Sequence, residues 1–192
     1  MTRFWWVRHG PTHAKGFVGW ADVPADLSDT AALTRLDKHL PKDALVISSD
    51  LQRSVATADA ICANRERLDH NRDFREMNFG DWDQKTFSDV AAIAPELSRM
   101  FWTDPGDCAP PNGESWHQTA DRVTKAVEQL AQRYAGRDII IVAHIGVILT
   151  QVQRASNMSP SAAMSFMIDN LSVTRIEYLG DAWRILGVNH KP

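Results

Sequence analysis

The sequence predicts an α/β fold: a three-layer sandwich with a mainly parallel central sheet and helices on both faces, in a single domain over residues 1–192. Three short apolar runs lack hydrophobic alternation, which is typical of strands covered on both faces. Amphipathic helical patterns lie between these runs, so strand and helix alternate along the chain. The length of 192 residues suits one sizeable core rather than two.

The apolar runs define the expected strands. Buried strands are predicted at Arg3–Val7, Ala44–Ile47 and Ile139–Ala143. Two later runs, Leu171–Tyr178 and Trp183–Val188, are separated by Gly180-Asp181 and predict a terminal hairpin.

Three apolar stripes define the expected helices. The first comprises Leu33, Leu36 and Leu40, with Ser28 or Asp29 as its N-cap. The second comprises Leu51, Val55, Ala58 and Cys62. The third is the clearest: it runs from Trp116 to Tyr134 and is closed by Gly136. Residues 104–113 are rich in Pro, Gly and Asn and predict a loop.

Composition narrows the class of partner. The net charge of −3 argues against a general nucleic-acid or membrane-surface binder. No apolar run approaches the length of a membrane span, and no leader-like segment opens the chain, so a cytoplasmic location is expected. The two cysteines, Cys62 and Cys108, are expected to be free thiols.

Basic and histidine side chains follow the ends of all three predicted central strands. Arg8 and His9 follow the first strand, and Gly10 turns the chain. Arg53 falls in the first turn of the helix after the second strand, and His144 follows the third. Carboxyl ends of parallel strands lie at one edge of a sheet, where ligands bind in open α/β folds. We therefore expect these four side chains to converge on one pocket.

This combination of residue types suits phosphoryl transfer. Arg8, Arg53 and His144 can each neutralise part of the charge on the phosphoryl oxygens. His9 is the candidate nucleophile, with one ring nitrogen attacking phosphorus while the other donates its proton to a fixed acceptor. A backbone carbonyl near Gly10 is the candidate acceptor.

A leaving alkoxide also needs a proton, and Glu76 is the candidate donor. It precedes a Phe-Gly-Asp-Trp turn, and partial burial would raise its pKa toward that of a useful acid. The same carboxylate would then take a proton from the attacking water. Taken alone, Glu76 ranks below other carboxylates such as Glu66 or Glu114.

Each of these residues also has a structural interpretation. A lone arginine on a helix is usually a solvated charge, and a histidine after an apolar strand is usually a hydrogen-bonded structural residue. Trp20, Trp82 and Trp116 are expected to pack in the core or at a rim rather than stack on substrate. Only the convergence of several groups favours the catalytic interpretation.

The motifs, in their order along nearly the whole chain, resemble those of the histidine phosphatase superfamily, also called phosphoglycerate mutase-like, and in particular its small phosphatases. Val7–Thr12 resembles the family's Arg-His-Gly-Glu-Thr signature, and Gly19–Ser28 its Gly-Trp-x-Asp-x-Pro-Leu-(Ser/Thr) segment. Ser48–Ala58 resembles Ser-Ser-x-Leu-x-Arg-(x)3-Thr-Ala, and Glu76–Asp83 resembles Glu-x-x-Phe-Gly-x-Trp-Glu. Gly113-Glu114-Ser115 and Val142-Ala143-His144 also fit the family pattern.

The resemblance implies a phosphohistidine intermediate on His9, a pocket of Arg8, Arg53 and His144, and Glu76 as proton donor. It implies no metal and no cofactor. Further phosphate- or substrate-binding positions are expected at Thr12, Lys15, Trp20 and Ile145.

Three positions depart from the family pattern near the expected pocket. Pro11 replaces the usual Glu or Gln, and Lys15 stands where several members have an Asn that reaches the phosphate. Ile145 replaces the usual Gly after the second histidine; its backbone N–H can still donate to a phosphate oxygen. Asp83-Gln84 also replaces the common Glu-Gly. None of these changes removes a group that the mechanism requires.

The leading functional hypothesis is a metal-independent phosphomonoester hydrolase acting on a small phosphorylated metabolite. The alternative within enzymes is a 2,3-bisphosphoglycerate-dependent phosphoglycerate mutase, although the stretch between Trp82 and Glu114 is shorter than such mutases usually carry. The alternative of another class is a catalytically inactive phosphate-binding or regulatory module. Substrate identity and oligomeric state stay open, with a homodimer as one option.

Overall fold

A six-stranded sheet forms the middle layer of the computed structural model, which describes residues 1–192. The strand order is β3-β2-β4-β1-β5-β6. The first four strands in this order run parallel to one another, and the terminal hairpin joins antiparallel to β1. The strands are β1 Thr2–Arg8, β2 Leu45–Ser48, β3 Glu66–Arg67, β4 Asp138–Ala143, β5 Val173–Tyr178 and β6 Trp183–His190.

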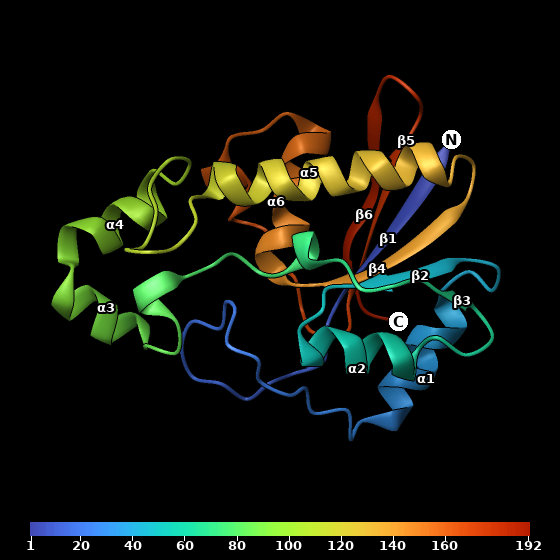
Figure 1. The fold of residues 1–192 in the computed structure, drawn as a ribbon, viewed down its shortest axis with the longest axis horizontal. Coiled ribbons are helices and arrows are strands. Elements are labelled where there is room, and N and C mark those ends of the chain that lie inside the picture. Colours follow the sequence, from blue (N-terminus) through green and yellow to red (C-terminus); the bar gives the residue numbers. More distant parts are fainter.

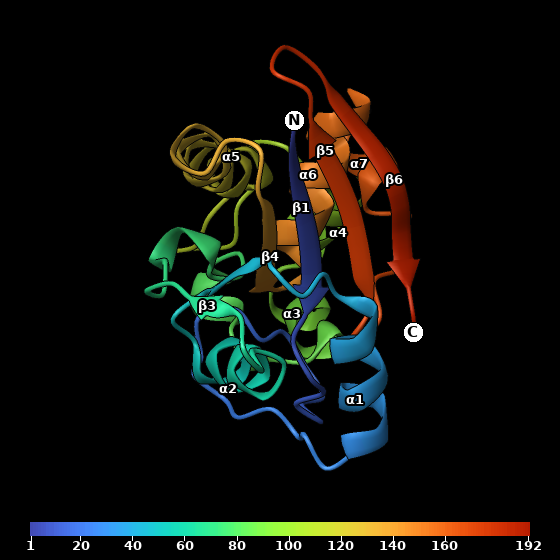
Figure 2. The same cartoon turned by 90° about the vertical axis from the view of Figure 1, so that its right-hand side faces the viewer.

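Helices cover both faces of this sheet, as the sequence predicts (Figures 1 and 2). Helices α1 and α2 lie on one face, and α5 and α6 lie on the other. Helices α3 and α4 project beyond one end of the sheet (Figure 1). The helices are α1 Thr30–His39, α2 Gln52–Ala60, α3 Phe87–Ile93, α4 Pro95–Thr103, α5 Trp116–Arg133, α6 Ile145–Ser156 and α7 Pro160–Ala163, with 3-10 turns η1 Arg72–Phe74 and η2 Gly80–Trp82.

Alternate residues of the central strands enter two separate cores. On β4, Ile140 packs with Leu36 and Ile61 from the α1 and α2 side. The flanking Ile139 and Ile141 belong to the larger core on the α5 and α6 side. Each buried aliphatic side chain contributes about 1.5–3 kcal/mol relative to exposure. Burial on both faces explains why the strand sequences are uniformly apolar.

The predicted strands and their boundaries agree closely with the structure. The main difference is at β5, which begins at Val173 because Leu171 has a φ of 59°, a left-handed conformation that a strand cannot contain. Asp29, not Ser28, is the N-cap of α1, and its carboxylate accepts from the Ala32 N–H. The long helix α5 is preceded by a Ser115 capping box, which the apolar stripe did not indicate.

Three helices of seven or more residues were not predicted. Six of the twelve residues of α6 are buried, so the helix lacks the polar face by which an amphipathic helix is recognised. Asn157 at its C-cap, with a φ of 54°, was the available signal. Helix α3 begins with a Thr86 capping box and α4 with Pro95 at its first turn, both of which are helix-start signals.

No helix combines the length and the apolar character needed to cross a bilayer. Cys62 and Cys108 are both free.

Candidate active site

The carboxyl ends of the three central parallel strands lie at the same edge of the sheet. Strand β4 lies between β2 and β1, with Arg8 paired to Ala143 and Ser48 paired to Val142. His9 and His144 each follow their strand directly, and Arg53 lies in the first turn of α2. The ring centroids of the two histidines are 5.0 Å apart.

His9 is held in one tautomer by its own loop. Its Nδ1 lies 2.7 Å from the Gly10 carbonyl oxygen, which only accepts, so Nδ1 carries the proton and Nε2 keeps its lone pair. Burial, followed by the charge of Arg53, lowers the pKa of His9 to about 3. Asn170 donates through Nδ2 to the His9 backbone oxygen at 2.8 Å. The result is a neutral, oriented imidazole with one free nitrogen.

His144 is fully buried and is bonded through both ring nitrogens. Its Nε2 lies 2.8 Å from Ser49 Oγ and 3.2 Å from Ser54 Oγ. Its Nδ1 accepts from Arg53 Nε at 3.3 Å. Burial, reinforced by the neighbouring His9, lowers its pKa well below the usual value. In this arrangement a neutral His144 orients Arg53.

Arg53 is fully buried at the strand ends. Neither Arg53 nor His144 is among the residues that line the cavity beside Arg8 and His9, although all four were expected to share one pocket. Its two terminal nitrogens donate to the carbonyl oxygens of Ala21 and Gly19 at 2.8 and 2.7 Å. Each terminal nitrogen carries a second N–H, for which no protein acceptor is found. Desolvation lowers the pKa of Arg53, but a guanidinium keeps its charge in proteins.

Arg8 reaches the cavity wall from the end of β1. Its Nη1 donates to the Ile168 carbonyl oxygen at 2.6 Å, whereas its Nε is buried without a hydrogen-bond partner. A buried N–H of a charged group beside His9 is a donor suited to an anionic oxygen.

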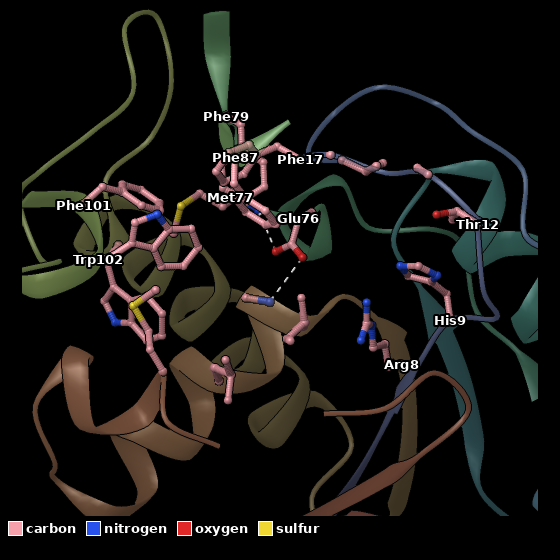
Figure 3. Close-up of a pocket in the computed structure, with 18 of the residues that line it drawn as sticks. Arg8, His9, Thr12, Phe17, Glu76, Met77, Phe79, Phe87, Phe101 and Trp102 are labelled. Carbon is pink, nitrogen blue, oxygen red and sulfur yellow. Dashed lines mark hydrogen bonds between the residues drawn. The ribbon is translucent and has the colours of Figure 1, made fainter. Parts of the chain in front are cut away.

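Glu76 completes the set, and its carboxylate is buried. Oε1 accepts from the Met77 N–H at 2.9 Å and Oε2 from the Gly146 N–H at 3.2 Å (Figure 3). Burial is the largest influence and raises the pKa of Glu76 above that of a free glutamate. A protonated form therefore persists to higher pH than usual, as a general acid requires.

A second tier of residues holds the segment that carries Glu76. Arg122 on α5 forms a two-pronged ion pair with Glu114, at 2.8 Å for each prong. The same guanidinium donates to the carbonyl oxygens of Asp73, Arg75 and Glu76. From the sequence, Glu114 was considered as an alternative carboxylate and as part of the Gly113-Glu114-Ser115 match to the family pattern, and no supporting role was predicted for it. Arg122 was not predicted at all, because no local pattern links a helix arginine to a distant backbone.

The remaining predicted site residues divide into two groups. Thr12 and Ile145 line a cavity together with Arg8, His9 and Glu76. Lys15 is exposed and lies outside that lining. Trp20 also lies outside it.

Trp20 instead supports the backbone of Glu76. Its Nε1 donates to the Glu76 carbonyl oxygen at 2.8 Å. The guanidinium groups of Arg72 and Arg75 each lie 5.1 Å from its ring centroid. Trp82 and Trp116 are buried, as the packing interpretation expects, although Trp116 also contributes to the cavity lining.

The cavity has a volume of about 360 Å³, and its lining is mostly apolar. Aromatic side chains come from the loop before α1, the residue before η2, α3, α4, the start of α5 and the segment after α7. Further aliphatic side chains come from α6. No three His, Cys, Asp or Glu side chains gather in a group able to hold a metal ion.

Comparison with known proteins identifies the family of this chain. The family model for the histidine phosphatase superfamily, branch 1, matches residues 4–191. The chain belongs to the histidine phosphatase superfamily. It is a phosphatase of this superfamily.

Two curated relatives and one solved structure illustrate the similarity. Phosphoglycerate mutase-like protein 4 of Arabidopsis thaliana is 32% identical over 189 residues, covering 93% of this chain and 81% of its own. The adenosylcobalamin/alpha-ribazole phosphatase of Salmonella typhimurium is 28% identical over 174 residues, covering 87% and 86%. The structure of Bacillus stearothermophilus YhfR superposes with a TM-score of 0.91 at 26% identity, covering 99% and 98%.

Proposed function

We propose that this histidine phosphatase hydrolyses a phosphomonoester through a phosphohistidine on His9, without a metal ion. The observation that carries the proposal is the bond from His9 Nδ1 to the Gly10 carbonyl oxygen, which leaves Nε2 as a free nucleophile. The low pKa of His9 keeps that nitrogen unprotonated at neutral pH.

In the first step, His9 Nε2 forms a bond to phosphorus as the bond from phosphorus to the ester oxygen breaks. Glu76, in its protonated form, transfers its proton to the departing oxygen, so a neutral alcohol leaves. Arg8 and Arg53 neutralise charge on the phosphoryl oxygens. A direct contact from His144 to the phosphoryl group stays a prediction, as do the binding roles of Thr12, Lys15, Trp20 and Ile145.

In the second step, water attacks phosphorus and the phosphorus–nitrogen bond breaks. Glu76, now a carboxylate, accepts a proton from the water, and the His9 lone pair is restored. Inorganic phosphate leaves, and the enzyme returns to its starting state.

The test is a rapid acid-or-base quench with a ³²P-labelled monoester. We expect a protein-bound phosphate that is labile in acid and stable in base, and that is absent from His9→Ala. Circular dichroism serves to establish that the variant is folded. A folded His9→Ala variant with unchanged turnover would remove His9 from the nucleophile role.

Two further measurements separate the alternatives. Hydrolysis of p-nitrophenyl phosphate should persist in EDTA, and loss of activity on chelation would contradict the metal-free mechanism. A mutase would interconvert phosphoglycerates faster than it releases phosphate. A binding or regulatory module would bind phosphate but turn over no ester in a broad panel.

A further inference from the structure

The cavity has two chemically different ends. Arg8, His9 and Thr12 lie at one end, and a group of aromatic side chains lies at the other, with Glu76 between them (Figure 3). For an ester attacked at phosphorus by His9, this order would bring the ester oxygen toward Glu76 and the alcohol part of the ester toward the aromatic end.

The aromatic end is a continuous assembly of rings from separate segments. Phe17 lies 4.6 Å from Phe87 and 4.8 Å from Phe79, measured between ring centroids. Trp102 lies 6.0 Å from Phe17 and 5.1 Å from Phe101. Rings packed against one another in this way present a preformed wall, and a ligand need not order it.

Part of this wall is exposed although its side chains are large and apolar. Phe87 is 56% exposed, Trp102 is 44% exposed, and Phe166, which also lines the cavity, is 38% exposed. Single exposed apolar residues are ordinary, but three that line the same cavity beside a nucleophile form a ligand surface.

The charged side chains among the lining residues restrict the charge of the substrate. Arg8 is the only lysine or arginine among the lining residues, and Glu76 is the only carboxylate. Arg8 is adjacent to His9 and serves the transferred phosphoryl group. A second phosphate or a carboxylate on the substrate would therefore lose its hydration at the aromatic end without gaining a cation there.

We propose that the alcohol part of the substrate is an uncharged apolar group, aromatic or extended alkyl, that binds against Phe17, Phe87 and Trp102. This inference rests on the proposed phosphatase function and specifies its substrate class. It also disfavours the bisphosphoglycerate-dependent mutase, whose ligands carry at least two anionic groups.

The test compares monoesters of primary alcohols, because their leaving groups differ little in basicity. The probes are ethyl phosphate, 3-phenylpropyl phosphate and 3-phosphoglycerate. Transfer of the additional apolar surface into the cavity should raise kcat/KM for 3-phenylpropyl phosphate over ethyl phosphate by on the order of tenfold or more. The kcat/KM for 3-phenylpropyl phosphate should also exceed that for 3-phosphoglycerate by at least the same factor.

A pair of variants on α4 provides the matched control. Trp102→Ala should remove most of the preference for 3-phenylpropyl phosphate over ethyl phosphate, measured as the ratio of their kcat/KM values. Met100→Ala, on the same helix and 48% exposed but outside the cavity lining, should keep the full preference. Inhibition of the wild-type enzyme by 3-phenylpropylphosphonate, compared with methylphosphonate, gives a measurement independent of any variant.

The outcomes distinguish the two proposals. Equal kcat/KM for ethyl and 3-phenylpropyl phosphate, or a preference for 3-phosphoglycerate, would overturn the substrate-class inference while leaving phosphatase activity intact. Equal loss of preference in Trp102→Ala and Met100→Ala would overturn the assignment of the aromatic end of the cavity as the surface that binds the alcohol part. If none of the esters is hydrolysed and no phosphoenzyme forms, the proposed function itself fails.

Discussion

A β-carbon on Gly146 would lie 2.5 Å from Oε1 of Glu76. The backbone N–H of Gly146 also donates to Oε2 of the same carboxylate at 3.2 Å. The first turn of α6 therefore approaches the proposed acid so closely that only a hydrogen fits on the α-carbon. The position of the Glu76 carboxylate depends on this close approach.

Gly146→Ala should displace the Glu76 carboxylate and impair proton donation. For an alkyl phosphate, we expect kcat to fall on the order of 100-fold. For p-nitrophenyl phosphate the loss should be much smaller, because nitrophenolate leaves without a proton. Steady-state kinetics with both substrates measures this difference.

Gly187→Ala is the matched control, since a β-carbon there would meet nothing within 4 Å. It should leave both substrates unaffected. Equal losses on the alkyl and nitrophenyl esters in Gly146→Ala would mean that the close approach serves binding or folding rather than proton transfer.

The low pKa of His9 should make folding stability depend on pH. Between about pH 6.5 and about pH 3, the unfolded chain protonates this imidazole and the folded protein does not. Wild-type stability should therefore fall relative to His9→Gln as the pH falls, by up to about 1.4 kcal/mol per pH unit.

Urea unfolding of both proteins at about pH 7.5 and about pH 5 measures this effect. Glu76 acts in the opposite sense, because its raised pKa contributes stability that is present at low pH and is lost as the pH rises. Since both proteins retain Glu76, the comparison isolates His9. An identical stability difference at the two pH values would refute the buried neutral imidazole.

Arg122→Lys should loosen the segment that carries Glu76. A lysine cannot reproduce the two-pronged bond to Glu114 together with the bonds to three backbone carbonyl oxygens. We expect a loss of about 2–4 kcal/mol in the free energy of unfolding. The effect on kcat for alkyl phosphates should exceed the effect on KM.

Arg133→Lys, at the exposed end of the same helix, is the control and should change neither stability nor kinetics. If Arg122→Lys raises KM while kcat is unchanged, Arg122 acts on substrate binding rather than on the acid.

Arg53→Lys tests whether catalysis needs the several N–H groups of the buried, planar guanidinium rather than only its positive charge. One ammonium cannot at the same time contact Gly19, Ala21, His144 and a phosphoryl oxygen. We expect kcat/KM to fall on the order of 100-fold, with weaker inhibition by inorganic phosphate. Arg35→Lys on the exposed face of α1 is the control, and equal kinetics in the two variants would contradict the assignment.

Local sequence was sufficient for five of the six strands and for the residues at the ends of the central ones; the two-residue edge strand β3, Glu66–Arg67, was not predicted. Buried strands need apolar side chains on both faces, so the runs that became β1, β2 and β4 are visible without any structure. Because these strands pair in parallel, the residues that follow them, His9, Arg53 and His144, lie at one edge of the sheet. This placement follows from the alternation of strands and helices along the chain. The Gly10 carbonyl was also predictable as the acceptor for His9, because it is the neighbouring residue.

Contacts between distant segments were not predictable. Arg122 reaches the carbonyl oxygen of Glu76 across 46 positions of the chain, and Gly146 meets the same glutamate across 70. The aromatic end of the cavity depends likewise on packing among the segment after Gly16 and helices α3 and α4. The sequence by itself determined which chemical groups end the strands, because hydrophobic periodicity is local. Only the tertiary structure decided how the acid is held and what faces the leaving group, because those depend on distances between elements that no local pattern encodes.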